Sequence, residues 1–510
     1  MYKETKASAP VVLKEEVLRN QPNGIELFSG IGGNFSSISE IICEMVDDPV
    51  SNLLHNKDCL AINNEIIVRF EDLGSRVGIM VADSGSGIRN LHNALTIAGR
   101  ADPDTPLNSH GFGLKHALAS CAAGGTEDWW IETRTQDNVL DNTFCRVSGP
   151  FRTGTSEDDP VMKILHCEGY GHVGAHTGTV VYTSCADSVF MTAKPNKKCA
   201  KASFASLVGY IIEHLRYTYA ELLDSEKIVI KVVSVDRSGK DTVVTLMPLL
   251  PDWEDGTMQE HHEIKCNLGG GELLATIRYG QIRPSSDNAF YFKGNQDSSG
   301  VQVGFNGRVI TNKLFGPVFG EAIHNSQNRF IAQIDLQTDN LEALPGTKNT
   351  KTSFSEGDPR YAALLKLIAT YVPAPEKDLE KLEDKLKRQL AEQEGKDSNN
   401  FRADREEMVF RTAGSKALID LYVAQKDGQV VIYEAKAHTS TVKDIGQLLM
   451  YILGCIYDGK PANEAVLIAG RHSKEVIPLI PVMNEMLAGM GIDCKMTLDT
   501  WNNRGISVPA

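Results

Sequence analysis

Residues 415–454 constrain the fold of this chain more than any other stretch. Two apolar runs with a two-residue period, ALIDLYVA and VVIYEAKA, flank a polar turn, and an apolar helical pattern follows them. The period of two places Glu434 and Lys436 on one face of the second strand, across the hairpin from Asp420 on the first. The sequence therefore predicts two strands that bring a lysine and two carboxylates together.

A carboxylate and a lysine among apolar neighbours are costly to bury unless they are paired or bind a metal ion. We expect Asp420 and Glu434 to share a Mg²⁺ that polarises a phosphodiester, while Lys436 holds or activates the attacking water. A buried salt bridge between Glu434 and Lys436 is the structural alternative.

The spacing D-x13-E-x-K resembles the active-site motif of the PD-(D/E)XK nuclease superfamily. The resemblance implies an α/β/α nuclease domain, which we place at 401–510, and an acid on the helix that precedes the two strands. A helix predicted over 403–411 offers Glu406 and Glu407 for that acid, and we favour Glu407.

The helix predicted over 442–457 carries a second part of this resemblance. Gln447 and Tyr451 are similar to the Q-x-x-x-Y motif of the RecB-like branch of the superfamily. The resemblance implies that these two side chains support the active centre and the substrate.

Three glycine-containing segments occur in a fixed order upstream. They are VADSGSGI (81–88), NSHGFGLKHALAS (108–120) and HTGTVVYTS (176–184). Asp83 ends an apolar strand, where its carboxylate can accept a hydrogen bond from an exocyclic amine such as that of adenine. Glycines at a helix start let backbone N–H groups and the positive end of the helix dipole face phosphates.

The order and spacing of these segments resemble the GHKL ATPase superfamily, which includes gyrase B subunits, MutL, the ninety-kilodalton heat-shock chaperones, histidine kinases and MORC proteins. The resemblance covers roughly residues 25–190 and implies ATP and Mg²⁺ as cofactors, with residues 97–110 as a mobile lid. The implied binding residues are Asp83 for adenine, Gly85 and Gly87 for the pocket, Gly111, Gly113 and Lys115 for the phosphates, and Thr179 as the last motif.

In this superfamily an asparagine on the first long helix holds Mg²⁺, and Asn56, 27 residues before Asp83, has the expected interval. A glutamate four residues earlier acts as general base in the hydrolysing members, but this chain has Asn52 there, and an amide cannot take the proton. Hydrolysis is then slow, or Glu44, Asp47 or Asp48 serves instead. A shifted register with Glu44 as base and Asp48 in place of the asparagine is the second choice.

The chain is expected to be α+β, with three domains joined by one linker. We assign 1–195 to the ATP-binding domain, 196–372 to a ribosomal-protein-like transducer domain, and 373–400 to a charged connecting helix. The transducer assignment rests on resemblance to MORC, MutL and gyrase-like proteins, in which a lysine reaches the γ-phosphate. Lys348 and Lys351 are the candidates.

The charge balance limits the partners. With 52 basic and 66 acidic residues, the net charge of −14 argues against a general polyanion binder, so DNA must be contacted through a local patch. The ten cysteines form no C-x-x-C pair, which argues against a zinc ribbon. No stretch is apolar enough to span a bilayer and no signal peptide is evident, so we expect a cytoplasmic protein without membrane contact.

Together these patterns predict an ATP-regulated, Mg²⁺-dependent endonuclease that cuts double-stranded DNA as a homodimer. This architecture suggests bacterial defence against phage or plasmid DNA, with a partner protein from the same defence locus. Two alternatives stay open: a non-cleaving, MORC-like DNA clamp and a MutL-like repair factor that nicks one strand. A chaperone-like function leaves Asp420, Glu434 and Lys436 unexplained.

Overall fold

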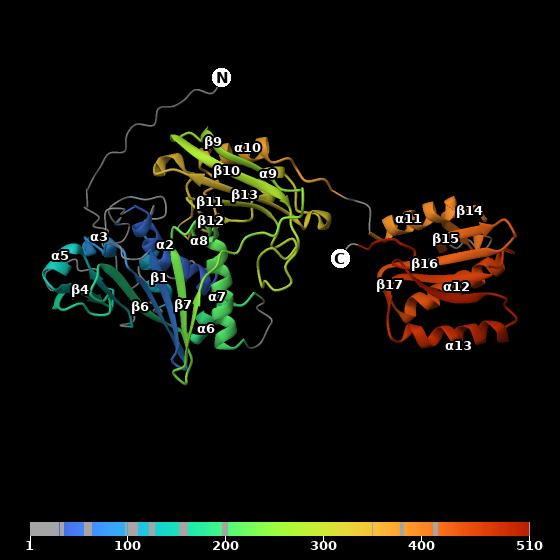
Figure 1. Ribbon diagram of the computed structural model, residues 1–510, viewed down its shortest axis with the longest axis horizontal. Coiled ribbons are helices and arrows are strands. Elements are labelled where there is room, and N and C mark those ends of the chain that lie inside the picture. Colours follow the sequence, from blue (N-terminus) through green and yellow to red (C-terminus); the bar gives the residue numbers. More distant parts are fainter. Residues whose placement is uncertain are drawn as a thin grey trace, which may run out of the picture. The chain divides into compact units, whose positions relative to one another are not determined.

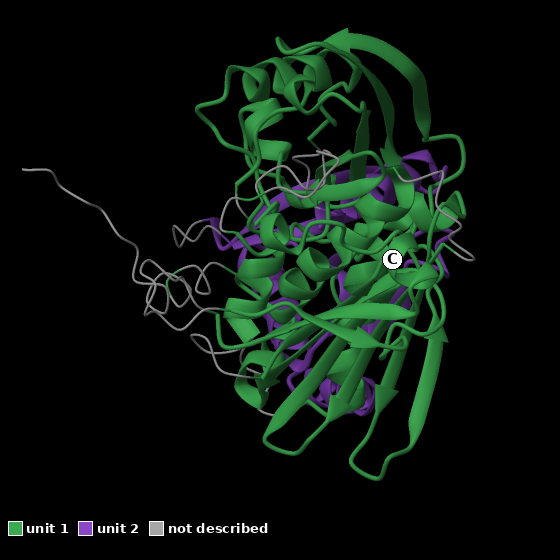
Figure 2. Ribbon diagram, turned by 90° about the vertical axis from the view of Figure 1, so that its left-hand side faces the viewer, with its two compact units in different colours: residues 1–377 green, residues 378–510 purple. Residues whose placement is uncertain are grey.

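The computed structural model describes Gly30 and residues 35–55, 64–96, 99, 111–121, 128–151, 162–195, 202–348, 350–377, 382–411 and 417–508. The chain divides into two compact units, residues 1–377 and 378–510 (Figure 2). Asn56 and, apart from Gly99, the predicted lid 97–110 lie outside the described residues. Among the described helices, none combines the length and the apolar character needed to cross a membrane.

The first unit contains an eight-stranded sheet with the order β5-β4-β3-β6-β2-β1-β7-β8 (Figure 1). Its strands are β1 (Glu65–Asp72), β2 (Arg76–Asp83), β3 (Trp130–Arg134), β4 (Thr143–Ser148), β5 (Leu165–Glu168), β6 (Gly178–Ala186), β7 (Val229–Val235) and β8 (Asp241–Thr245). Neighbouring strands are antiparallel except β1 and β7, which run parallel.

The long helices of this part are α2 (Ile38–His55), α4 (Gly113–Cys121) and α7 (Phe204–Thr218), and α2 packs against the other two. All three contribute to the hydrophobic core beneath the sheet. Short elements complete this part: α3 (Leu91–Leu95), α5 (Gln136–Leu140), α6 (Asp187–Phe190), η3 (Met191–Ala193) and α8 (Ala220–Asp224). Because α2 is buried over most of its length, its acidic residues Glu44 and Asp47 lie inside the protein.

A second, five-stranded sheet has the order β12-β11-β13-β10-β9. It consists of β9 (Gln259–Asn267), β10 (Glu272–Gln281), β11 (Gly300–Phe305), β12 (Arg308–Thr311) and β13 (Phe330–Gln337). With it lie α9 (Phe315–Phe319), η4 (Asn325–Gln327), η5 (Leu341–Ala343) and α10 (Pro359–Tyr371), and a separate core joins α9 and α10 to the sheet.

The boundary between the first two cores differs from the predicted one. The segment from 196 was assigned to the transducer domain, but α7 packs in the first core and β7 pairs with β1, from Glu65↔Val229 to Glu71↔Val235. The physical reason is that Ile228, Ile230 and Val232 belong to the core beneath the first sheet. The fully buried residues of the second core begin at Leu268, and Ile264 and Cys266 pack against them.

The second unit is a five-stranded sheet with the order β14-β15-β16-β17-β18. Its elements are α11 (Leu382–Lys396), β14 (Asn400–Val409), β15 (Ala417–Gln425), β16 (Val430–Ser440), α12 (Val442–Tyr457), β17 (Glu464–His472), α13 (Val476–Gly489) and β18 (Lys495–Thr500). Helices α12 and α13 contribute to the core on one face of the sheet, and α11 contributes to the core on the other. The predicted mixed α+β organisation of the chain is confirmed.

Two elements of this unit differ from the sequence-based expectation. Residues 403–411, predicted as a helix, lie mostly in strand β14, because they pair with β15 from Arg405↔Leu421 to Val409↔Ala417. The helix within 373–400, predicted as a solvated connection, is α11, and it packs on the sheet because Leu386 and Leu390 are buried there.

Two candidate active sites

Two of the three glycine segments of the first unit, those that contain Asp83 and Thr179, meet at the ends of β2 and β6. Asp83 is paired with Thr179 across these strands, and the N–H of Gly85 donates to Asp83 Oδ1 at 2.8 Å. Space is tight there, since a Cβ at Gly178 would lie 2.2 Å from the carbonyl oxygen of Asp83 and one at Gly85 would lie 2.3 Å from Asn52 Oδ1. The turn therefore depends on glycine at these two positions.

Burial raises the pKa of Asp83 to about 7, and the hydrogen bond from the N–H of Gly85 acts in the opposite direction. Because an unfolded aspartate titrates near pH 4, the folded state binds this proton more tightly, and Asp83 destabilises the fold as pH rises from about 4 through 7. We therefore expect Asp83→Asn to raise the unfolding free energy at pH 8 by about 1 kcal/mol or more, and to gain nothing at pH 4. Thermal unfolding of both proteins at the two pH values measures this; an equal gain at both would contradict it.

Asn52 connects α2 to the glycine turn. Its Nδ2 donates to Ser86 Oγ at 2.9 Å, and its Oδ1 accepts from the backbone N–H of Ser86 at 2.8 Å. The Asn52 amide is thus engaged in holding the turn that carries Gly85 and Gly87. Gly87 itself has a φ of 74°, and a Cβ there would lie 2.4 Å from the carbonyl oxygen of Arg134.

Glu44, two helical turns earlier on α2, lies at the start of α4. A Cβ at Gly113 would lie 2.4 Å from Glu44 Oε2, and Lys351 Nζ is 3.1 Å from the same oxygen. The carboxylate is buried, and burial raises its pKa. Among the described residues, Lys351 is the partner of the Glu44 carboxylate, and no further hydrogen bond to its two oxygens is formed.

The transducer lysine candidates differ in position. Lys348 is exposed, whereas Lys351 is buried and forms ion pairs with Glu44 and, at 3.1 Å, with Asp47. Burial lowers the pKa of Lys351, but Asp47 and Glu44 outweigh that and raise it. Lys351 therefore remains charged beside Glu44.

Asp47 ties α2 to the second sheet. Its Oδ1 accepts from Arg308 Nε on β12 at 3.0 Å and from the Tyr219 hydroxyl at 2.7 Å. Arg308 also donates to the carbonyl oxygen of Lys351 at 2.9 Å. Sequence reasoning missed Arg308, because no local pattern marks one arginine of a strand as the partner of a distant helix.

A cavity opens between α2, α3 and the start of α4. Its lining includes Asp48, Asn52, Gly87, Asn93, Gly111, Gly113 and Lys115. Lys115 Nζ donates to the carbonyl oxygen of Ala94 at 2.8 Å, and burial lowers its pKa to about 8, with Asp48 acting in the opposite direction. The Asp48 carboxylate is the oxygen ligand that α2 presents to this cavity and that fits Mg²⁺.

The predicted nuclease centre of the second unit lies where β15 and β16 separate. Their pairing ends at Leu421↔Tyr433, after which β16 continues alongside β17 only. Asp420 is just beyond this fork, and its Oδ2 accepts from the backbone N–H of Ala435 at 2.8 Å. The fork thereby brings Asp420 beside Glu434, as the hairpin pattern predicted.

Glu434 is fully buried, and Lys436 Nζ lies 2.5 Å from its Oε1. Burial raises the pKa of Glu434 to about 7, and the charges of Asp420 and Asp444 act in the same direction while Lys436 opposes them. The other oxygen, Oε2, is buried and has no hydrogen bond of normal geometry within the described residues, and the Tyr451 hydroxyl is the polar group that interacts with this carboxylate. A buried carboxylate with a second carboxylate, Asp420, beside it fits a site that receives a cation.

Helix α11 contributes two residues to this centre that sequence reasoning missed. Lys387 Nζ is 2.7 Å from Asp420 Oδ1, and Glu383 lies 4.0 Å from Lys436 Nζ. A signal was present, because Glu383 and Lys387 each follow a leucine of the apolar stripe, Leu382 and Leu386, and so border the buried face.

On α12, Gln447 Nε2 donates to the Tyr451 hydroxyl at 2.7 Å. Tyr451 is buried, and its pKa is raised to about 12, first by burial and also by the charges of Glu434 and Asp420 and a hydrogen bond with Glu434. Tyr451 thus lies toward the predicted nuclease centre, and Gln447 is joined to it through this hydrogen bond.

Glu407 is placed differently from the prediction. It lies on β14, not on a helix, and its carboxylate is paired with Arg402 and Arg411. It lines a separate cavity together with Tyr457 and other residues. Glu383 on α11 and Asp444 on α12, each 4.0 Å from Lys436 Nζ, are the further acids that the structure places beside Lys436, whereas Glu407 is not among them. The described residues contain no group of three or more His, Cys, Asp or Glu side chains that could by themselves hold a metal ion.

Comparison with known proteins gives limited information. No family model matches the chain, and no curated protein matches it. The N-terminal domain of a DNA repair protein is similar in structure, with 15% identity, a TM-score of 0.39, and coverage of 68% of this chain and 96% of that one. The B subunit of the DNA gyrase from Myxococcus xanthus has 12% identity, a TM-score of 0.32, and coverage of 65% and 88%. At these scores neither likeness decides the function, which has to be inferred from the two sites.

Proposed function

We propose that this chain is an ATP-controlled, Mg²⁺-dependent DNA endonuclease. The observation that carries the proposal is the fork between β15 and β16, where Asp420, Glu434 and Lys436 meet and Glu434 is fully buried. Glu434 and Lys436 alone would form a structural salt bridge, and the carboxylate of Asp420 at the fork supplies the second oxygen ligand that a metal site needs.

In the nuclease centre, Asp420 and Glu434 would hold the Mg²⁺, with water as its remaining ligands. When bound, the ion supplies a Lewis acid that polarises the phosphodiester. Lys436 then orients the attacking water, while Lys387 and Glu383 on α11 hold Asp420 and Lys436 in place. The hydrogen-bonded pair of Gln447 and Tyr451 would border the proposed centre on the side where α12 lies.

In the first unit, Asp83 would accept the adenine amine, and the N–H groups at the start of α4 would face the phosphates. We favour the register in which Glu44 is the general base and Asp48 the Mg²⁺ ligand, because Glu44 lies against Gly113 and Lys351 whereas Asn52 holds the glycine turn. Lys351, rather than the exposed Lys348, would reach the terminal phosphate.

The ion pairs of α2 would couple nucleotide binding to the position of the second sheet. A phosphate that attracts Lys351 competes with Glu44 and Asp47, and Asp47 is also bonded to Arg308 of the second sheet. Nucleotide binding would thereby shift the second sheet relative to α2 and promote pairing of the first units. Two nuclease centres in one particle can cut both strands of a duplex. Bacterial defence, with a partner protein from the same locus, is the biological role that this design suits.

The test is cleavage of supercoiled plasmid and linear DNA by the full chain in Mg²⁺, with and without ATP. We expect double-strand breaks that EDTA abolishes and whose rate changes with ATP. Asp83→Ala should remove the ATP dependence without removing the metal dependence. Nicks without double-strand breaks would favour the MutL-like repair factor, and no cleavage with any nucleotide would favour the non-cleaving clamp.

A further inference from the structure

Helices α12 and α13 of the second unit are apolar on their outward sides as well as their inward sides. After Asp444, α12 has no charged residue up to its end at Tyr457, and α13 has a single one, Glu485. A helix that is apolar all round is normally buried. Here the inward side chains fill the core, and the outward ones are left uncovered.

The two helices lie over neighbouring strands on the same face of the sheet. Helix α12 packs over β16 and β17, and α13 packs over β18, the neighbour of β17 (Figure 1). Both helices contribute to one core on the same face of the sheet. Their exposed large apolar side chains, which we call the α12–α13 surface, are Met450, Leu453, Ile456, Tyr457, Ile477, Val482, Met486 and Met490.

The size of the α12–α13 surface matches that of an interface. Each of these side chains exposes between 37% and 58% of its area. Seven of the eight are not aromatic, so we take the low end of the range for a large aromatic side chain, roughly 150 Å². The exposed apolar area is then about 600 Å², the upper end of the range for the largest patch of a typical monomer, roughly 300–600 Å². A stable pair of proteins buries about 800 Å² on each partner.

We propose that the α12–α13 surface is a two-fold interface that joins two copies of this chain without nucleotide. The α12–α13 surface has few charged residues, which favours a second copy of this chain as its partner. Permanent homodimer interfaces are more apolar than the interfaces of transient partners, which keep polar surfaces. A two-fold contact also buries the same apolar surface twice.

This contact leaves the nuclease centre accessible. Tyr451, which faces the centre, is buried on the inward side of α12, whereas Met450, Leu453 and Tyr457 lie outward. Two centres would then be tethered before ATP acts, a consequence that rests on the proposed nuclease function. The dimer itself does not depend on that function.

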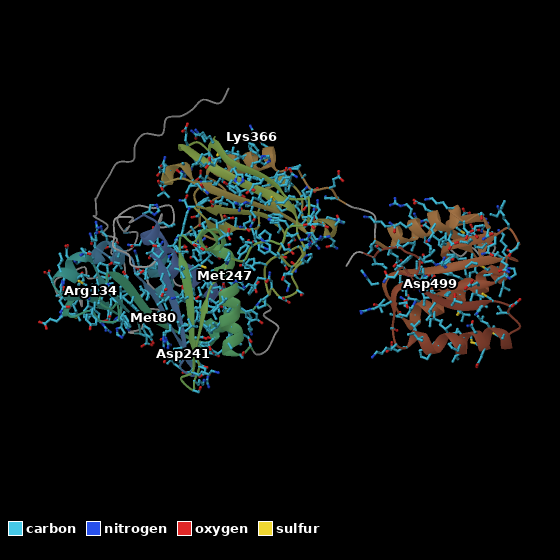
Figure 3. The ribbon with its side chains drawn as sticks, in the orientation of Figure 1. Met80, Arg134, Asp241, Met247, Lys366 and Asp499 are labelled. Atoms are coloured by element: carbon cyan, nitrogen blue, oxygen red, sulfur yellow. The ribbon has the colours of Figure 1, made fainter. Side chains whose placement is uncertain are left out.

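The experiment is sedimentation equilibrium of the full chain at micromolar concentration without nucleotide or metal. The wild type is expected at twice the chain mass. Met450→Glu on α12 and Met486→Glu on α13 each introduce two charges into the contact, one from each copy. The dissociation constant of the dimer should therefore rise by about 100-fold. Met247→Glu, an equally charged change at an exposed methionine of the first unit (Figure 3), should leave the dimer intact.

Three outcomes would overturn the proposal. The first is a monomeric wild type. The second is a dimer that neither glutamate weakens, which would place the contact elsewhere. The third is a monomer whose radius in small-angle scattering grows in Met486→Glu, which would mean that the chain's own first unit covers the surface. Cleavage assays are not part of this readout, so failure of the nuclease proposal remains distinguishable.

Discussion

Glu434→Gln is expected to lower Mg²⁺-dependent DNA cleavage by at least about 100-fold while the protein stays folded. The amide matches the carboxylate in size but cannot supply the negative charge that a cation beside Asp420 requires. Folding should tolerate it, because burial already disfavours the ionised form of Glu434. Initial rates of plasmid cleavage measure the effect, and thermal unfolding checks the fold.

The matched control is Glu407→Gln. This residue has the same side chain in the same unit, but it is paired with Arg402 and Arg411 and lines a separate cavity. Its cleavage rate should stay within about twofold of the wild type, an expectation for a site away from the chemistry. A loss in Glu407→Gln that matches the loss in Glu434→Gln would restore Glu407 as the upstream acid and remove Glu383 from that role.

Glu44→Gln should lower ATP turnover by about 10²–10⁴-fold, the range for loss of a general base, with ATP affinity nearly unchanged. Asn52→Ala should do the reverse, because it releases the glycine turn that Ser86 anchors to α2. Affinity should fall while the turnover of bound ATP is largely kept. Titration with a fluorescent ATP analogue and single-turnover hydrolysis separate the two effects.

The comparison decides between the two registers of α2. If Asn52→Ala stops hydrolysis at unchanged affinity and Glu44→Gln has no effect, Asn52 is at the catalytic position and the chain needs another base. Asp48→Asn provides a further check, since an asparagine oxygen can still bind Mg²⁺. It should weaken the Mg²⁺ dependence of turnover less than Asp48→Ala does.

Local sequence patterns were sufficient where function depends on neighbours in the same strand or turn. The two-residue period of β16 predicts Glu434 beside Lys436, and the hairpin predicts Asp420 opposite them. The glycine turn after Asp83 could be predicted for the same reason, because it needs only a strand end and residues that allow close approach.

Longer-range placement was beyond the sequence. Glu44, Asp48 and Asn52 are spaced by four residues, so they share one stripe of α2, and periodicity cannot tell which of them faces the start of α4. Only the packing of α2 against α4 and the approach of Lys351 place Glu44 there. Lys348 and Lys351 are likewise equivalent in sequence and separated only by burial.

The sequence by itself thus determined the elements that carry the chemistry: the strands, the glycine turns and the paired carboxylate and lysine, since these follow from backbone period and local sterics. The tertiary structure decided the rest. In the tertiary structure β7 pairs in the first sheet, and residues 403–411 lie mostly in a strand although the sequence pattern predicts a helix. Helix α11 packs on the sheet of the second unit, where Lys387 contacts Asp420 and Glu383 lies near Lys436. Pairing and burial energies belong to contacts between distant segments, and they outweigh local propensity wherever the two disagree.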